Sequence, residues 1–389
     1  MKIITNGKIF FKNQFIEEDI FIEKDRILGI GHTQKHDLRM ATEIIDAKGL
    51  LVLPGLIDVH VHLRDPGQTY KEDFTSGTRA ALAGGITTVM DMPNNTKPTV
   101  TLDRLEEKEE WAAEKALCDV RFHFGCTNNN FNEIKQANPN SLKLYMFKTT
   151  QAQDLCITDE KIIEKHMLNF NKKIVVHAED NDVEKVCSIA QKCKRKIHLA
   201  HTPTRKQIDI TKRTGNTNEV APHHLFLSTK DQEQLGKLSG VHPHLRTEEE
   251  RKDLWNKLDD IDCIATDHAP HTLEEKRAGA AGFPGLETSL SLMLDAYNKR
   301  LMNINWIAGR MSENPAKIFN LPHIGRIESG YYANLAFIDL KKEWVVKGNE
   351  LETKCKWSPF EGKLLKGKNV RTMYKGKLVY ENGEFIDAY

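Results

Sequence analysis

Residues 55–67 read Gly-Leu-Ile-Asp-Val-His-Val-His-Leu-Arg-Asp-Pro-Gly and follow the apolar run Leu-Val-Leu at 51–53. The apolar residues predict a strand that leads into the two histidines. Because side chains on a strand alternate between its faces, His60 and His62 point to the same side and can bind one metal ion. Two partly exposed strand histidines would show the same spacing, so the surrounding chain has to decide between these interpretations.

From residue 54 to about residue 320, short apolar runs alternate with charged stretches that are long enough for helices. This pattern is typical of repeated βα units around a parallel sheet. We expect helices at 74–83, ending before Gly84-Gly85, and at 102–117. The apolar runs predict strands at 87–90, 142–147, 174–176, 196–199 and 263–265. In parallel barrels the catalytic residues lie at the C-terminal ends of strands, which is where the two histidines stand.

The two ends of the chain have a different pattern. Short strands with polar turns are predicted at 1–9, 20–22, 26–30 and 50–53, and strands return at 334–340, 344–346, 370–374 and 377–380. Residues 374–377, Tyr-Lys-Gly-Lys, suit a hairpin turn. We therefore expect the two β-rich ends to form one small domain.

Later predicted strands also end in residues that could hold a metal: Lys143, His177, His201 and Asp267. Imidazole and carboxylate ligands without thiolate suit zinc, with manganese, cobalt and iron as alternatives. A single catalytic zinc needs three protein ligands, and this set is too large for one ion. The sequence therefore favours two metal ions roughly 3.5–4 Å apart that share a hydroxide. An anionic group should also bridge them, which a lysine ammonium cannot do.

Composition narrows the class of function. Lys and Arg total 56 against 55 acidic residues, so no attraction to nucleic acid or to an anionic membrane is expected. The lysine-rich stretch 192–196 fits a solvated helix end. No apolar run approaches a membrane span and no N-terminal signal region is seen, which favours a cytoplasmic protein. Seven cysteines without a CxxC pair argue against disulfides and against a thiolate zinc site. A small-molecule substrate fits best.

Residues 55–67 and 84–94 resemble the dihydroorotase signature within the amidohydrolase superfamily, as do 219–225 (Glu-Val-Ala-Pro-His-His-Leu), 266–271 (Thr-Asp-His-Ala-Pro-His) and 358–362 (Ser-Pro-Phe-Glu-Gly). The resemblance implies an α/β fold: a TIM-like (β/α)8 barrel over 54–321 and a β-sandwich from 1–53 and 322–389. It also implies a cyclic amide hydrolase that reversibly converts N-carbamoyl-L-aspartate to (S)-dihydroorotate in de novo pyrimidine biosynthesis.

The resemblance assigns the predicted ligands to two zinc ions. His60, His62 and Asp267 would hold one ion, and His177 and His201 the other. In dihydroorotases with a Lys-Leu-Tyr strand the lysine is carboxylated by CO₂, which would make Lys143 the anionic bridge beside the hydroxide. Lys148 is a rival that lies outside the Lys-Leu-Tyr match. Asp267 would also be catalytic, moving a proton to and from the substrate amide nitrogen.

A dicarboxylate substrate needs cationic and hydrogen-bonding partners. Arg64 is suited to a bidentate grip on the α-carboxylate, since its guanidinium is planar and permanently charged. By resemblance, the remaining contacts are Asn94, His271, the backbone of Pro284 and Gly285, His242, and Thr149 and Thr150 of a loop that closes over the substrate. His242 is a departure, because many relatives carry Asn or Arg at this position.

Two alternatives remain at this level. A hydantoinase or allantoinase would have nearly the same metal core, but its substrates lack the carboxylate that gives Arg64 its purpose. An inactive scaffold that binds an aspartate transcarbamoylase would be expected to have lost ligands, and none of the six is lost. An active enzyme could still form a homodimer or associate with aspartate transcarbamoylase.

Overall fold

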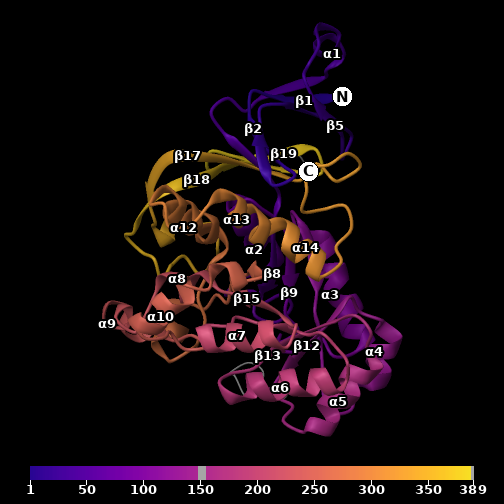
Figure 1. Cartoon of the computed structure of the whole chain (residues 1–389), viewed down its shortest axis with the longest axis vertical. Helices are drawn as coiled ribbons and strands as arrows, with labels where there is room; N and C mark the ends of the chain where they lie inside the picture. Colours follow the sequence, from indigo (N-terminus) through magenta and orange to yellow (C-terminus); the bar gives the residue numbers. More distant parts are fainter. Residues whose placement is uncertain (148–154, 387–389) are drawn as a thin grey trace.

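A computed structural model describes residues 1–147 and 155–386 of the chain. Figure 1 shows two parts: the strands of both chain ends, in indigo and yellow, lie together at one end, and the magenta to orange middle of the chain forms the other part. The candidate loop residues Thr149 and Thr150 lie outside the described residues.

The middle of the chain forms a parallel barrel. Its strands run in the orders β10-β9-β8 and β11-β12-β13-β14-β15-β16, all in parallel pairs. Only His123 separates β10 from β11, so these two fill a single place between β9 and β12. The bounds are β8 Leu56–Val61, β9 Ile86–Asp91, β10 Asp119–Phe122, β11 Phe124–Gly125, β12 Ser141–Tyr145, β13 Lys173–His177, β14 His198–Leu199, β15 Thr217–Val220 and β16 Cys263–Ile264.

The chain after β16 closes the barrel against β8. His62 N donates to His268 O over 2.8 Å, and Val61 forms a parallel bridge with His268. The strands thus occupy eight places in a closed ring, which confirms the predicted (β/α)8 architecture. The ring was only partly visible in the sequence, because the strands at 119–125 and 217–220 carry too many polar residues to form an apolar run.

Helices alternate with the barrel strands as predicted. Helix α2 spans Phe74–Ala83, the predicted bounds, and begins at Asp73, whose side chain accepts from Ser76 N over 2.7 Å. Helix α3, Leu102–Lys115, ends two residues before the end predicted at residue 117. The other helices of this part are α4 Phe131–Ala137, α5 Glu160–Asn169, α6 Asn181–Lys192, α7 Arg205–Arg213, α8 Pro222–Phe226, α9 Asp231–Leu235, α10 Glu248–Trp255, α11 Leu273–Arg277, α12 Leu286–Asn298, α13 Ile304–Ala308 and α14 Asn314–Ile318. Among the described residues, no helix combines the length and hydropathy of a membrane span.

Both chain ends contribute to the second part. A four-stranded sheet has the order β5-β4-β1-β6, and a seven-stranded mixed sheet has the order β20-β19-β18-β17-β7-β2-β3. Strand β7 pairs with β2 on one side and with β17 on the other, which joins the two ends. The bounds are β1 Lys2–Thr5, β2 Lys8–Phe11, β3 Gln14–Ile16, β4 Asp19–Glu23, β5 Arg26–Gly31, β6 Glu43–Asp46, β7 Leu51–Pro54, β17 Leu335–Val345, β18 Leu364–Tyr374, β19 Lys377–Glu381 and β20 Glu384–Phe385; helix α1, Lys35–Met40, lies between β5 and β6.

The strand predictions for this part were largely correct. The hairpin at 374–377 is confirmed, with Lys375 and Gly376 both at positive φ. The strands expected at 334–340 and 344–346 are one strand, β17, whose pairing shifts between Asp339 and Glu343. The residues at such an irregularity break the alternating pattern of a strand, so the sequence predicted two strands in place of one. The limits 1–53 and 322–389 for the sandwich, and 54–321 for the barrel, stay predictions.

Candidate active site

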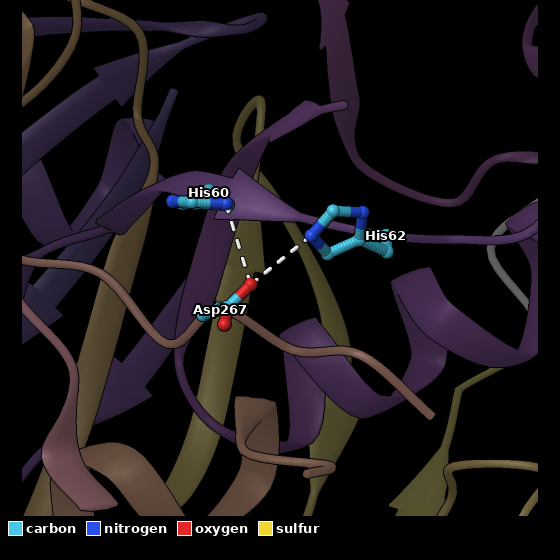
Figure 2. Close-up of side chains that lie close together, drawn as sticks. All are labelled: His60, His62 and Asp267. Carbon is cyan, nitrogen blue, oxygen red and sulfur yellow. Dashed lines mark hydrogen bonds and ion pairs between the residues drawn. The ribbon is translucent and has the colours of Figure 1, made fainter. Parts of the chain in front are cut away.

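Three of the predicted ligands meet at the C-terminal ends of β8 and β16. Asp267 Oδ1 lies 3.0 Å from His62 Nε2 and 3.3 Å from His60 Nε2. Figure 2 marks both contacts with dashed lines. All three side chains are buried, and their potential ligand atoms lie within 4.8 Å of one another. The end of the first barrel strand is thus brought against the end of the last, where imidazole and carboxylate can share a metal ion.

The second predicted pair lies beside this group. His177, the last residue of β13, and His201, which follows β14, have Nδ1 and Nε2 2.9 Å apart. The ring centre of His201 is 5.1 Å from that of His60. Lys143 on β12 is fully buried, and its Nζ has no hydrogen-bond partner among the described residues. Five barrel strands, or the residues that directly follow them, therefore carry the candidate ligands.

Burial keeps the imidazoles neutral. It lowers the pKa of His60 to about 4 and, for His62 and His201, holds the pKa well below the usual value. A neutral imidazole is the form that ligates a metal. Burial also lowers the pKa of Lys143 to about 8, an effect that the carboxylates of Glu219 and Asp267 partly offset.

These observations fit a metal centre. The donors are neutral imidazole nitrogens and a carboxylate oxygen, a combination that suits zinc. Two buried nitrogens of the cluster, Lys143 Nζ and His201 Nδ1, have no hydrogen-bond partner in the described part of the chain. Buried polar atoms without partners are rare unless a ligand or ion satisfies them. The chain thus has candidate groups for a binuclear metal site.

Glu219 was not predicted as a functional residue. It lies on β15, and its Oε1 contacts His60 Nδ1 and accepts from His201 N over 3.1 Å, while Oε2 lies 3.0 Å from His198 Nε2. Burial alone would raise its pKa, but His60 and His198 hold the pKa of this carboxyl well below its usual range. The residue opens the motif at 219–225, yet nothing in that motif indicates that its side chain faces His60.

A small cavity of about 50 Å³ opens beside the cluster, and three of the predicted substrate residues line it: Arg64, Asn94 and His242. Asn94 Oδ1 lies 2.7 Å from His62 Nδ1. Because an amide oxygen only accepts, Nδ1 of His62 carries the proton and its Nε2 is left with a lone pair facing Asp267. Asn94 thus orients a candidate ligand as well as lining the cavity.

Arg64 and His271 lie next to each other. Arg64 Nε donates to Pro270 O over 3.2 Å, and its Nη2 lies 3.2 Å from His271 Nε2. The guanidinium is buried, which lowers its pKa to about 10, while the nearby Asp267 and Asp91 oppose this shift. Arg64 therefore stays charged at neutral pH.

Three further residues were predicted to contact the substrate: Pro284, Gly285 and His242. Pro284 and Gly285 are not among its lining residues, and Gly285 N donates to His268 Nδ1 over 3.1 Å. His242 lines the cavity, with its ring centre 5.7 Å from that of Phe147. The contacts of Pro284, Gly285 and His242 with a substrate stay predictions. The neighbouring His224 has Nε2 3.0 Å from Pro243 O.

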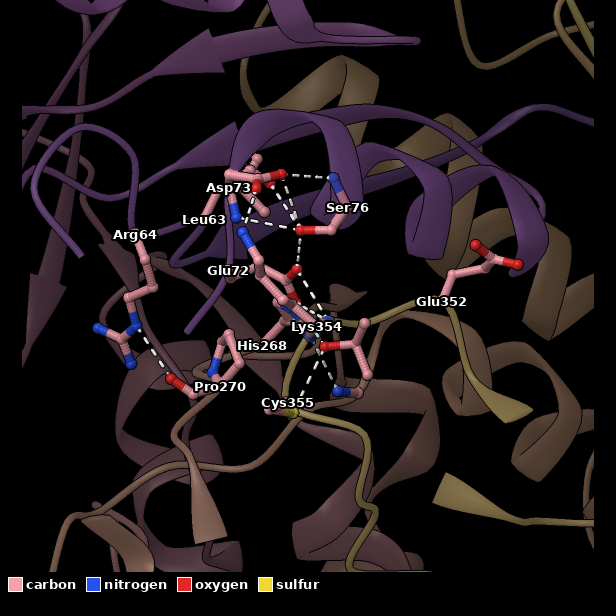
Figure 3. A network of polar contacts seen from close by, with 12 residues as sticks. Leu63, Arg64, Glu72, Asp73, Ser76, His268, Pro270, Glu352, Lys354 and Cys355 are labelled. Atoms are coloured by element: carbon pink, nitrogen blue, oxygen red, sulfur yellow. Dashed lines mark hydrogen bonds and ion pairs between the residues drawn. The ribbon is translucent and has the colours of Figure 1, made fainter. Parts of the chain in front are cut away.

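A polar network braces the segment that carries Asp267. His268 Nε2 lies 3.3 Å from Glu72 Oε2, and Glu72 accepts from Lys354 N over 3.1 Å; Figure 3 shows these three residues. Glu72 also contacts Thr353 Oγ1. The chain between β17 and β18 is thereby tied to the residue next to Asp267. Buried carboxylates held by several donors of this kind give a rigid support.

Comparisons with known proteins agree with this geometry. The sequence profile of the amidohydrolase family matches residues 51–379. A dihydroorotase of Pyrococcus horikoshii is 39% identical and covers 99% of this chain and 93% of its own. The multifunctional protein CAD of Squalus acanthias is 38% identical over 94% of this chain, which corresponds to 16% of that protein.

Solved structures give the same fold. An L-hydantoinase from Arthrobacter aurescens has a TM-score of 0.94 at 26% identity, over 99% of this chain and 97% of its own. A D-hydantoinase has a TM-score of 0.90 at 21% identity, over 99% and 96%. Together with the full-length sequence relatives, these matches show that the chain belongs to the amidohydrolase family, among the dihydroorotases.

Proposed function

We propose that the chain catalyses the reversible cyclisation of N-carbamoyl-L-aspartate to (S)-dihydroorotate in de novo pyrimidine biosynthesis. The observation that carries this proposal is the buried guanidinium of Arg64 in the same cavity as Asp267 and the histidine cluster. A buried cation favours ligands that bring a negative charge to it. Dihydroorotate carries an exocyclic carboxylate, two bonds away along the ring from the carbonyl carbon whose bond to nitrogen is made or broken.

We infer that two zinc ions occupy the site, held by His60, His62 and Asp267 on one side and by His177 and His201 on the other. When bound, such ions act as Lewis acids on a carbonyl oxygen and activate water. Lys143 would bridge them after its amine adds to CO₂, which forms a carbamate and releases a proton. Its burial without a hydrogen-bond partner in the described chain supports this modification.

Asp267 is the proposed proton carrier. In ring opening the leaving amide nitrogen gains a proton, and in ring closure the attacking nitrogen loses one. The carboxylate lines the cavity, and burial raises its pKa, which makes it a better proton acceptor. The same residue can therefore serve both directions of the reaction.

Arg64, His271 and Asn94 are the proposed carboxylate grip. Because Oδ1 of Asn94 accepts from His62, its Nδ2 is directed elsewhere and can donate to an anionic ligand. His242 contributes a further ring nitrogen at the cavity, and its Nδ1 has no hydrogen-bond partner among the described residues. Backbone contacts from Pro284 and Gly285, and closure by Thr149 and Thr150, belong to the same proposal.

A hydantoinase-like cyclic amidase is the second candidate, and the L-hydantoinase structure favours it by its similarity over the whole chain. Arg64 distinguishes the two, because hydantoin brings no carboxylate to a buried guanidinium. An inactive scaffold is disfavoured because all six predicted ligands are kept and lie at one place. Association with aspartate transcarbamoylase, a homodimer and a cytoplasmic location stay part of the proposal.

The test is ring opening of L-dihydroorotate, followed by its loss of ultraviolet absorbance, with zinc-loaded and chelated protein. Hydantoin and allantoin serve as control substrates. We expect metal-dependent turnover of dihydroorotate that exceeds both controls. Turnover of hydantoin or allantoin without turnover of dihydroorotate would keep the fold and the metal site but refute the substrate.

A further inference from the structure

Lys108 is a buried charged residue that belongs neither to the proposed metal ligands nor to the residues proposed to bind the substrate carboxylate. It lies on the inner face of α3 and is fully buried. Its Nζ forms an ion pair with Asp91 Oδ2 at 2.6 Å and donates to Met92 O over 2.9 Å and to Asn95 Oδ1 over 2.7 Å. A buried ammonium is costly to desolvate, so such a group persists only with close partners.

Two of these partners form hydrogen bonds with the residues directly before and after Arg64. Asp91 Oδ1 accepts from Leu63 N over 2.7 Å, and Asn95 Nδ2 donates to Asp65 O over 3.1 Å. Leu63 and Asp65 are the chain neighbours of Arg64, whose φ of 63° lies in the left-handed region. Residues with a side chain seldom adopt this region, and they do so where their surroundings hold them.

The same ammonium fixes the segment of Asn94. Met92 and Asn95 stand on either side of the Pro93-Asn94 pair, and both accept from Lys108 Nζ. Asn94 in turn contacts His62. One nitrogen atom on α3 therefore links the two turns that carry Arg64 and Asn94, although α3 itself contributes no residue to the cavity lining.

We propose that Lys108, through its ion pair with Asp91, is a positioning residue for substrate-carboxylate recognition. It holds the turns at 63–65 and 92–95 in one arrangement, so that Arg64 and Asn94 present their donors together. This inference rests on the proposed function, because it takes Arg64 and Asn94 as the residues that grip the carboxylate. If Lys108 served folding alone, removing it would lower the stability of the protein but would not raise KM for the substrate.

The first test compares three variants of the zinc-loaded protein: Lys108→Met, the charge-balanced Lys108→Met/Asp91→Asn, and Lys212→Met. Lys212 pairs with Asp262 at 2.7 Å beside the start of β16, at the other end of the barrel, and is the control. Both Lys108 variants should raise KM for L-dihydroorotate by about tenfold or more, with a much smaller change in kcat and an unchanged zinc content. The double variant leaves no uncompensated buried carboxylate, so it answers the question if the single variant fails to fold.

A double-mutant cycle then asks whether Lys108 acts through Arg64. In an Arg64→Met background, the Lys108→Met/Asp91→Asn change should raise KM by a smaller factor than it does in wild type, because one of the two groups that it positions is already gone. Fully additive effects on KM would overturn the proposal. So would an unchanged KM in the folded Lys108 variants, or an equal rise in KM with Lys212→Met.

Hydrogen exchange separates this inference from the proposed function, since it needs no substrate. Backbone amides at 62–66 and 92–96 should exchange faster in the double variant than in wild type or Lys212→Met, while the other barrel strands keep their protection. Unchanged exchange in both segments would overturn the positioning role. If wild-type protein failed to open dihydroorotate, the proposed function alone would fall, and the exchange result would still decide whether Lys108 orders the two turns.

Discussion

The imidazole of His60 contacts the carboxylate of Glu219 through Nδ1, on the ring edge opposite the Nε2 that faces Asp267. A carboxylate only accepts, so Nδ1 carries the proton and Nε2 presents its lone pair to the cluster. Glu219 also accepts from the backbone N of His201, which belongs to the second proposed ligand pair. One carboxylate thus orients parts of both halves of the site.

Glu219→Gln tests this orientation. The amide removes the charge that favours the Nδ1–H form of His60, so zinc affinity should fall by about 10- to 100-fold. Zinc titration with a competing chelator measures the change. Glu160→Gln, which alters a partly exposed contact with Lys185, serves as the control and should bind zinc as wild type does. Equal zinc affinity in the two variants would contradict the assigned role of Glu219.

Arg64→Met tests the carboxylate grip. A charge-assisted hydrogen bond contributes about 1.5–3 kcal/mol, so kcat/KM for L-dihydroorotate should fall roughly 10- to 150-fold. Steady-state kinetics with dihydroorotate and with hydantoin provide the measurement, and any activity on hydantoin should be reduced less. Arg213→Met, at an exposed ion pair with Glu184, is the matched control. An equal loss with both substrates would argue for a general structural defect.

Lys143→Ala tests the proposed carbamate bridge. Without the bridge, zinc content should drop and dihydroorotate turnover should fall roughly 10²- to 10⁴-fold, because both ions depend on that ligand. Added acetate or propionate should restore part of the zinc content and activity by filling the space that the side chain leaves. Lys148→Ala tests the rival lysine directly and should keep full zinc content; the reverse pattern would assign the bridge to Lys148.

Asp73 gives a stability prediction with a definite pH dependence. Burial raises its pKa, but the hydrogen bonds with Lys354 and Ser76 outweigh this effect and leave the pKa below its usual value. A carboxyl with a lowered pKa stabilises the folded state above its unfolded pKa, and this contribution disappears as the pH falls through the folded pKa. Asp73→Ala should therefore lower the free energy of unfolding by about 0.5–2 kcal/mol at pH 7 and by less near pH 3.

Unfolding by urea at both pH values measures the effect, with metal-free protein throughout, because protonated histidines do not hold zinc at pH 3. The same difference between wild type and Asp73→Ala at pH 7 and pH 3 would contradict the ionic part of the argument and leave only the loss of a neutral helix cap.

The sequence predicted the residues whose roles follow from their place on a strand. His60 and His62 alternate to one face, and Asp267 follows the last barrel strand, so their meeting required only the rule that barrel strands end at a common face. Glu219 was missed because its proposed role depends on its contact with His60, which lies on a strand far from it in the sequence. Lys108 was missed for a related reason: helix α3 is rich in Glu and Lys, and its sequence does not reveal which lysine points inward.

The place of β7 between β2 and β17 has a consequence for synthesis of the chain. Leu51–Pro54 leaves the ribosome long before its partner strand Leu335–Val345 exists. At about 5–20 residues per second, that interval lasts roughly 15–60 s. During this time one edge of β7 has no strand to pair with, and open edges promote pairing between different chains. A nascent chain that stalls before residue 335 would therefore expose the unpaired edge of β7, which could pair with another chain. We expect chaperones that shield β-strands to matter most in that interval.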